Sequence, residues 1–442
     1  MDLWMAQAAR VLKVGRDSHG SLDSLVHDDA LAEHAAEGLD PSFAFAIRLA
    51  RGLLACGMPS HRVEESLVRL ATALGFDIDS FCMPTALIVT LSKPSEEGPQ
   101  DVRTRVVRVE PGVTNLEKLS ALHDLVGRVE RRELTPGHGV RRIEAILARP
   151  PRYGAWSETI GFGMISTVAA MLLGGGGIDL PIAGGLGLLV GLLDAMSQKV
   201  PTLARLLPTV AAFSISFVGS MLAWQGLPVR PSVLLLAAII VLLPGFTVTT
   251  ATMELATAHL VAGTARLVGG IVTFLQLGFG VALGRKLAEI LPRLPRPLPL
   301  EPIPEWSLLA APLLSAVGYT LLLRARKRDS VWVLLAVVIA LVGSQVGGRW
   351  LGPEIGAFVG ALAVATASHL FARWRDRPVS LMLVPGILFL VPGSFGFLSI
   401  SSLLQNDVIT AVGTAFRMLL IASALAAGVL VATAAVPPRK AL

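Results

Sequence analysis

The chain has 442 residues, of which 53% are hydrophobic and 16% charged, and 43 are glycines. This composition falls outside that of ordinary soluble domains and indicates a membrane protein. The first 150 residues carry 18 Lys/Arg and 21 Asp/Glu, whereas the remainder carries 20 and 11. The basic excess therefore lies on the apolar part, where loops facing anionic lipid explain it, and we expect no nucleic-acid partner.

The two cysteines, Cys56 and Cys82, both lie in the polar N-terminal part of the chain. Two residues cannot form a framework of disulfide bridges, so free thiols in a cytosolic region are expected. The first 30 residues do not show a charged segment followed by an apolar stretch and a small-residue cleavage site. We therefore expect no removable signal peptide.

The N-terminal part divides into a tail and a mixed domain. Residues 1–40 are charged and poor in large apolar residues, which predicts a mobile tail. Residues 41–150 are predicted to form a cytoplasmic α/β domain, because helical periodicity alternates with short β-branched runs. Its predicted helices begin near Pro41, Ser60, Leu116 and Gly139, and its predicted strands are 85–91 and 104–109.

Beyond residue 150 the chain contains hydrophobic stretches of roughly 17 to 25 residues, each long enough to cross a ~30 Å hydrocarbon core. We place them at 157–174, 180–197, 205–224, 231–250, 263–283, 307–324, 330–346, 353–372, 379–398 and 409–434. A proline-rich linker at 292–306 separates a first membrane repeat of five helices, 151–291, from a second, 307–435. The predicted fold is an α-helical polytopic membrane protein with about ten transmembrane helices.

The strongest internal similarity is a proline-glycine break that occurs in both halves. Pro244-Gly245 follows two leucines, and Pro392-Gly393 follows Leu-Val; each break is followed by a segment containing Gly-Thr-Ala. Five helices per repeat is an odd number, so the two copies would enter the membrane from opposite sides. The pattern therefore predicts a 5+5 inverted repeat, and broken helices at equivalent positions mark the substrate site of a transporter.

A second similarity and the distribution of basic residues complete the topology. Leu180-Pro181 and Gly352-Pro353 each precede small residues, and we interpret both as openings of the second helix of a repeat. Most basic residues near the ends of the hydrophobic stretches fall on one side, which predicts a cytoplasmic N-terminal domain. The exception is a group in and before the linker, including Arg285 and Lys286, which a ten-helix topology places outside.

The ordered combination of these features resembles the threonine/serine exporter family of bacterial inner membranes. The features are Arg62-Val63-Glu64-Glu65, Pro84-Thr85-Ala86 and Asn115-Leu116 in the N-terminal domain, followed by ten apolar stretches with Leu-Pro-Gly and Val-Pro-Gly breaks. The resemblance extends from residue 41 to about 435. It implies proton-driven export of threonine, serine or similar small polar metabolites from the cytoplasmic membrane. Some relatives in this family are associated with dicarboxylate export, so a dicarboxylate such as succinate is an alternative substrate.

Few ionisable residues lie inside the apolar stretches, and such residues are costly in a membrane. Glu254, after the first break, and Asp194, in the second stretch, are the candidates for proton coupling. Glu254 is alternatively a solvated residue on a connecting helix. Asp194 is alternatively a carboxylate at a helix end near Lys199.

The predicted substrate-binding residues cluster around the two breaks. They are Pro244, Gly245, Thr249, Thr250, Pro392, Gly393 and Ser399. Proline leaves a backbone carbonyl free and glycine allows a ligand to approach the backbone, while the hydroxyls suit a zwitterion. Arg266 and Arg417 are able to meet a substrate carboxylate, but side chains extending to the interface are the favoured interpretation. His259 is interpreted as an interfacial residue.

Two other classes of protein compete with a transporter. A membrane-tethered hydrolase would act through the N-terminal domain, but no hydrolase motif or metal-ligand spacing occurs there. The Arg62–Glu65 cluster is interpreted as a solvated helix start. A channel or scaffold is disfavoured because no apolar stretch carries a polar stripe. We expect a transporter with a small amino-acid substrate, protons and the lipid bilayer as partners, without cofactor or metal; homo-oligomerisation stays open.

Overall fold

The computed structural model describes residues 40–92, 102–290 and 303–437. The predicted N-terminal tail, apart from Asp40, lies outside the described residues. So does most of the proline-rich linker at 292–306.

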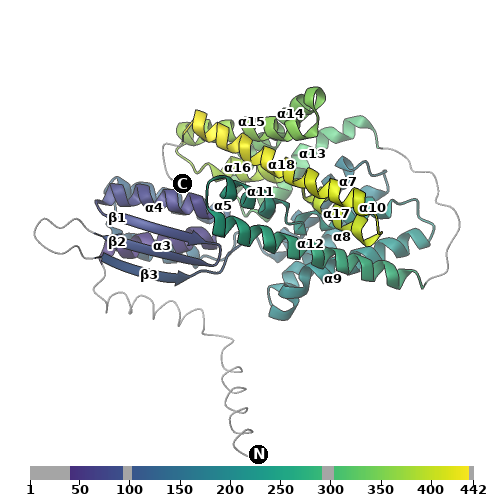
Figure 1. Ribbon diagram of the computed structural model, residues 1–442, viewed down its shortest axis with the longest axis horizontal. Coiled ribbons are helices and arrows are strands. Elements are labelled where there is room, and N and C mark those ends of the chain that lie inside the picture. Colours follow the sequence, from purple (N-terminus) through teal and green to yellow (C-terminus); the bar gives the residue numbers. More distant parts are fainter. Residues whose placement is uncertain (1–39, 93–101, 291–302, 438–442) are drawn as a thin grey trace, which may run out of the picture.

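The N-terminal region, residues 41–150, combines four helices with a small sheet (Figure 1). Its elements are α3 (Pro41–Ala55), α4 (Ser60–Leu74), β1 (Asp77–Met83), β2 (Ala86–Ser92), β3 (Val102–Arg108), α5 (Leu116–Glu130) and α6 (Pro136–Leu147). The sheet is antiparallel in the order β1-β2-β3, with Met83 opposite Ala86 and Ala86 opposite Arg108. The sequence predicted the ends of β2 and β3 to within two residues. It missed β1, because Asp77 and Asp79 on its exposed face are residues that strands disfavour.

One face of the sheet packs on helices. Leu87, Val89 and Leu91 alternate along β2 and are fully buried, and β2 contacts α3. The opposite face is open, as the 72% exposure of Val106 on β3 shows. Cys56 and Cys82 are free thiols, as predicted, and both are buried. Burial raises the pKa of Cys56 to about 11, so this thiol is unreactive.

The rest of the described chain is almost entirely helical. The first half contains α7 (Ala155–Leu172), α8 (Asp179–Ser197), α9 (Pro201–Trp224), α10 (Pro231–Ile239), η1 (Ile240–Leu242), α11 (Gly245–Ala256) and α12 (Leu260–Ala288). The second half contains η2 (Glu305–Ala310), α13 (Ala311–Leu322), η3 (Lys327–Asp329), α14 (Ser330–Leu351), α15 (Pro353–Arg375), α16 (Ser380–Leu390), α17 (Gly393–Leu404) and α18 (Val408–Ala435). Each predicted hydrophobic stretch coincides with one of these helices or with a broken pair.

Seven helices in the described part of the chain are long and apolar enough to cross a membrane. The pair α10–α11, bent by 53°, would be an eighth span. The helix from Trp306 to Leu322 is apolar but shorter than the others, and α7, with Glu158 in its first turn, is not among the seven. The protein is therefore a multi-pass membrane protein.

The two proline-glycine breaks have the same backbone geometry. Leu243 and Val391 are extended, with φ/ψ of −65°/128° and −62°/133°. Pro244 and Pro392 follow with −79°/33° and −82°/31°, and α11 or α17 begins at the next glycine. The ring of each proline disfavours a helical conformation at the preceding residue, and both α10–η1 and α16 end at this point.

Packing around the broken helices also matches between the halves. Helix α9 packs along α12, as α15 packs along α18. Helix α11 contacts α12 of its own half and α18 of the other, while α17 contacts α18 and, across the halves, α12. Because α9 packs along α12 as α15 packs along α18, α15 corresponds to α9, which is the third helix of the first half. Our assignment of Pro353 to the opening of a second helix was therefore wrong, because α13 and α14 both precede it.

The N-terminal region is attached to the membrane helices by polar contacts and a shared core. The amide of Leu116 donates to the carbonyl of Leu323 at 2.9 Å, and the Tyr153 hydroxyl donates to the carbonyl of Ala325 at 2.8 Å. One buried apolar cluster runs from the N-terminal region into the second half, whereas helices of the first half dominate another. This attachment places the start of α4 against α11.

Candidate functional site

The two breaks lie against each other at the centre of the helices. A Cβ added to Gly245 would lie 2.2 Å from Cγ1 of Val391 and 2.8 Å from Cα of Gly393. A Cβ on Gly393 would meet Cβ of Leu243 at 3.0 Å and Cα of Gly245 at 3.7 Å. Only a residue without a side chain permits this approach of the two backbones. The structure therefore brings together all four residues of the predicted breaks, Pro244, Gly245, Pro392 and Gly393.

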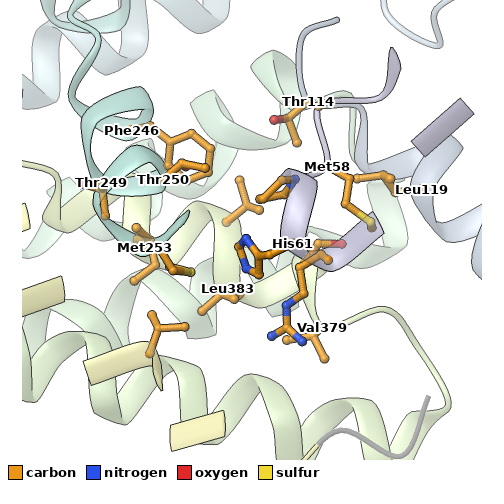
Figure 2. A pocket seen from close by; sticks show the side chains of 17 residues that line it. Met58, His61, Thr114, Leu119, Phe246, Thr249, Thr250, Met253, Val379 and Leu383 are labelled. Carbon is orange, nitrogen blue, oxygen red and sulfur yellow. The ribbon is translucent and has the colours of Figure 1, made fainter. Parts of the chain in front are cut away.

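A cavity of about 90 Å³ lies beside the breaks, between the N-terminal region and the membrane helices (Figure 2). Its walls are mostly apolar and include Met58, Phe246 and Leu383. The polar groups are few, and they come from His61, Arg62, Thr114, Thr249, Thr250 and Ser380. Apolar walls with a few convergent polar groups are typical of small-molecule sites, although this cavity is smaller than the roughly 300–1,000 Å³ of most such sites.

Both halves of the protein and the N-terminal region contribute to this cavity. Thr249 and Thr250 come from α11, after the first break, and Leu383 from α16, before the second. His61 and Arg62 come from the first turn of α4, and Figure 2 shows His61 beside Met253 of α11 and Leu383, which line the same cavity. The N-terminal region is therefore part of the cavity wall.

Glu254 is fully buried one turn beyond Thr250 on α11. Its carboxylate accepts a hydrogen bond from the backbone N–H of Ser60 at 2.9 Å. Nε of Arg266, on α12, lies 3.0 Å from Oε2 and 3.2 Å from Oε1 of Glu254. Because this side chain is fully buried and contacts Ser60 and Arg266, the interpretation of Glu254 as a solvated residue was wrong.

A second ionic contact joins the same two regions. Nε2 of His259 lies 2.9 Å from Oε2 of Glu64, and the other oxygen of Glu64 accepts from the amide of Cys82. Nδ1 of His259 lies 3.1 Å from the Thr257 hydroxyl. Glu64 is therefore a link between α4, β1 and the start of α12. The interpretation of Glu64 as part of a solvated helix start did not anticipate these contacts.

His61 is a buried, neutral histidine at the edge of this network. Burial, and then the charge of Arg62, lower the pKa of His61 from 6.5 to about 3. Its ring centroid lies 5.9 Å from that of His259. Nδ1 of His61 has no hydrogen-bond partner among the described residues. A buried, unpaired nitrogen in a cavity wall is available to a ligand.

The remaining predicted site residues lie apart from the cavity. Ser399 is buried, and its hydroxyl donates to the carbonyl of Ala411 at 2.7 Å. Asp194 accepts from the side-chain amide of Gln198 at 3.1 Å and lies near the ion pair of Glu158 and Arg324. Neither residue lines the cavity, and of the other predicted site residues only Thr249 and Thr250 do; Glu254 and the four break residues lie next to it without lining it.

The two arginines after the breaks pair with carboxylates of the protein itself. Arg266 pairs with Glu254, and Arg417 lies 2.9 Å from Glu354 and 5.1 Å from the centre of the Phe395 ring. Extension of Arg266 to the interface was therefore the wrong interpretation. Among the described residues, no group of three or more His, Cys, Asp or Glu side chains is arranged to hold a metal ion.

Sequence reasoning missed the contribution of the N-terminal region to the cavity. His61, Arg62 and Ser380 were not predicted as site residues, although they line it with Thr249 and Thr250. The only available signal was the placement of His61 and Glu64 on one side of a helix start. That signal is common on solvated helices, so it did not identify a partner.

Two family models match the chain. One, for threonine/serine exporters, matches residues 44–288, and a second, also for threonine/serine exporters, matches residues 308–435. Their boundary falls at the predicted linker between the halves. No solved structure matches the chain with significance.

Several fungal proteins are similar over most of this chain. Pheromone-regulated membrane protein 10 of Eremothecium gossypii is 26% identical over 82% of this chain and 49% of its own length. The protein of the same name in Candida albicans is 27% identical over 82% of this chain and 33% of its own length. The chain thus spans half or less of these curated relatives. Because the first exporter model alone covers more than half of the chain, this protein belongs to the threonine/serine exporter family.

Proposed function

We propose that this protein is a secondary active transporter that exports threonine, serine or a similar small polar metabolite, coupled to the proton gradient. The observation that carries the proposal is the fully buried Glu254 beside a cavity at two broken helices. Family membership supports export as the activity. The names of the fungal relatives specify a membrane location and add nothing about the substrate.

The cavity contains groups suited to a zwitterion. The Arg62 guanidinium would meet the carboxylate, and the unpaired Nδ1 of His61 would accept from the ammonium group. The hydroxyls of Thr249 and Thr250 would bind a substrate hydroxyl. The apolar walls leave room for a side chain of one or two carbons, which favours threonine or serine over larger amino acids.

Proton coupling would depend on the contacts of Glu254. In the structure, Arg266 and the Ser60 amide both contact its carboxylate. Movement of α4 or α12 away from α11 would remove these partners and leave a carboxyl in low dielectric, where protonation is favoured. Proton binding would then accompany the opening of the cavity. Asp194 has no such contact with the cavity.

The matched breaks and the exchanged packing of α11, α12, α17 and α18 support a 5+5 inverted repeat. In such an architecture one repeat moves relative to the other around a fixed site, which gives alternating access. The basic residues at helix ends support a cytoplasmic N-terminal domain at residues 41–150. A bacterial inner membrane is proposed from the resemblance to bacterial exporters alone, since the relatives reported above are fungal.

The exposed Val106 on β3 offers a test of this orientation, because both native thiols are buried. We expect Val106→Cys to be labelled by a membrane-impermeant thiol reagent only after the cells are opened. Labelling in intact cells would refute the cytoplasmic location. The unsubstituted protein, with its two buried cysteines, is the background control.

The transport proposal is tested by counterflow of labelled threonine in proteoliposomes, with and without a pH gradient. We expect Glu254→Gln to abolish accumulation driven by the gradient while leaving counterflow measurable. Glu158→Gln is the matched control, because Glu158 also pairs with an arginine, Arg324 at 2.6 Å, but lies on α7, whereas Glu254 follows the lining residue Met253 and contacts Ser60 of α4. Normal dependence of Glu254→Gln on the gradient would exclude Glu254 as the coupling residue. Competition by succinate but not by serine would instead assign a dicarboxylate substrate.

A further inference from the structure

A second cavity, of about 440 Å³, lies between the N-terminal region and the loop that connects α13 to α14. Its size falls within the roughly 300–1,000 Å³ of small-molecule sites. It is separate from the cavity beside the breaks, and the two share no lining residue. Nothing in the proposed transport mechanism uses it.

Four arginines from three parts of the chain line this second cavity. Arg128 lies on α5, Arg142 on α6, Arg149 just after α6, and Arg326 in the loop before α14. One acidic residue, Asp124, faces the same space, and Arg377, which is not in the lining, lies 3.8 Å from it. The cavity therefore carries a strong positive charge that its own residues do not balance.

The individual contacts of the arginines leave most of this charge available. Arg128 lies 3.7 Å from Glu133, but both side chains are more than a third exposed, so the pair is weak. Arg142 has no ion-pair or hydrogen-bond partner among the described residues. Burial, and then the charge of Arg328, lower the pKa of Arg326, and the nearby Asp124 and Asp329 do not reverse this shift.

The cavity also lies at the end of a membrane-spanning helix. Arg326 directly precedes the span Lys327–Arg349. Within the first turn of α14, the Trp332 ring packs with Trp374 at 6.3 Å, and the Arg375 guanidinium lies 4.2 Å from the centre of the Trp374 ring. Tryptophan and arginine side chains of this kind concentrate at the level of lipid headgroups.

We propose that this arginine-lined cavity binds a phosphate-bearing ligand, held jointly by α5, α6 and the loop before α14. Guanidinium groups bind phosphate with two parallel hydrogen bonds, and several of them around one cavity suit a doubly charged group. The ligand would join the N-terminal region to the membrane helices. Two sources offer the same chemistry, the headgroup of an anionic lipid and a soluble phosphate compound.

The experiment compares Arg142→Gln, alone and with Arg149→Gln, against the matched control Arg141→Gln. Arg141 is the exposed neighbour of Arg142 on the same helix and does not line the cavity. In one arm, native mass spectrometry of the purified full-length protein in detergent measures retention of phosphatidylglycerol against phosphatidylcholine. In the other arm, protein in pure phosphatidylcholine nanodiscs is titrated with inorganic phosphate or pyrophosphate against chloride of equal ionic strength, with the thermal midpoint as the readout.

We expect at least one ligand to bind the unsubstituted protein and Arg141→Gln equally, and to bind Arg142→Gln at least tenfold more weakly. Selective retention of phosphatidylglycerol alone would identify a lipid headgroup, and stabilisation by soluble phosphate alone would identify a soluble ligand. Absence of both would overturn the proposal, as would an equal loss in Arg141→Gln. Because Arg142 is exposed and unpaired, its single variant folds without a lost contact, which size-exclusion chromatography checks.

Discussion

The two broken helices have the same backbone conformation at their breaks but carry different side chains. Equivalent residues of the two breaks have φ and ψ angles that differ by only a few degrees. After the first break, Glu254 and Arg266 contact each other, and Glu254 also contacts the N-terminal region. After the second, the Ser399 hydroxyl only donates to a carbonyl of α18. The fold thus supplies two equivalent positions, but among the described residues a fully buried carboxylate paired with an arginine follows the first break and not the second, where the pair of Arg417 and Glu354 is at least a third exposed.

The largest difference in stability loss between the halves should follow removal of the carboxylate that pairs with Arg266 or with Arg417. Glu254→Ala leaves the Arg266 side chain, 20% exposed, without its partner and the Ser60 amide unsatisfied. We expect a loss of about 2–4 kcal/mol in the free energy of unfolding. Glu354→Ala breaks the Arg417 pair, in which both side chains are at least a third exposed, and should cost less than about 1 kcal/mol. Denaturant titration in mixed micelles measures both, and equal losses would contradict the asymmetry.

The glycines at the two breaks should also respond unequally to substitution. In Gly245→Ala the new Cβ would lie 2.2 Å from Val391 and 2.8 Å from the Gly393 backbone, so the broken helices must separate. We expect a cost of about 1–3 kcal/mol and a loss of counterflow. In Gly393→Ala the nearest contact is 3.0 Å, so a smaller effect is expected. If Gly393→Ala is the more damaging variant, the contact between the breaks is not the determining feature.

Acid should destabilise the first-half site through His61. The pKa of His61 is about 3 in the folded protein and 6.5 in the unfolded chain. Below pH 6.5 only the unfolded chain binds the proton, so stability falls as the pH decreases towards 3. Between pH 7.5 and 5 this should remove about 2 kcal/mol.

His61→Gln retains a neutral polar side chain and should lose less stability over the same pH range. Thermal midpoints at pH 7.5 and 5 for both proteins measure the difference. An identical decrease in the two proteins would assign the acid sensitivity to other groups.

The smallest expected effects distinguish a residue that contacts the substrate from one that only contributes to packing. Thr250 lines the cavity, so Thr250→Val should leave stability nearly unchanged but raise the KM for threonine severalfold. Ser399 does not line it and donates a 2.7 Å hydrogen bond, so Ser399→Ala should cost about 1 kcal/mol without changing KM. The reverse assignment of the two effects would move the substrate site towards the second half.

Local sequence signals were sufficient for the helices and the breaks. Hydrophobic length predicted the positions of the membrane helices, and proline predicted where α10–η1 and α16 end. Strand β1 was missed because Asp77 and Asp79 lie on its exposed face. The pairing of Pro353 with Pro181 also failed, because a proline at a helix start recurs in many helices and does not identify which one.

The sequence alone determined that the chain crosses the membrane and carries two matching broken helices, because these properties depend on composition and on residues adjacent in the chain. Only the tertiary structure decided the partners of the charged groups. Ser60 and Glu254 are 194 residues apart, and Glu64 and His259 are 195 apart. No local pattern predicts such a contact, because the residues next to a glutamate in the sequence do not show whether its side chain is buried or solvated. The contacts of Ser60 with Glu254 and of Glu64 with His259 hold α4 in place as part of the cavity wall.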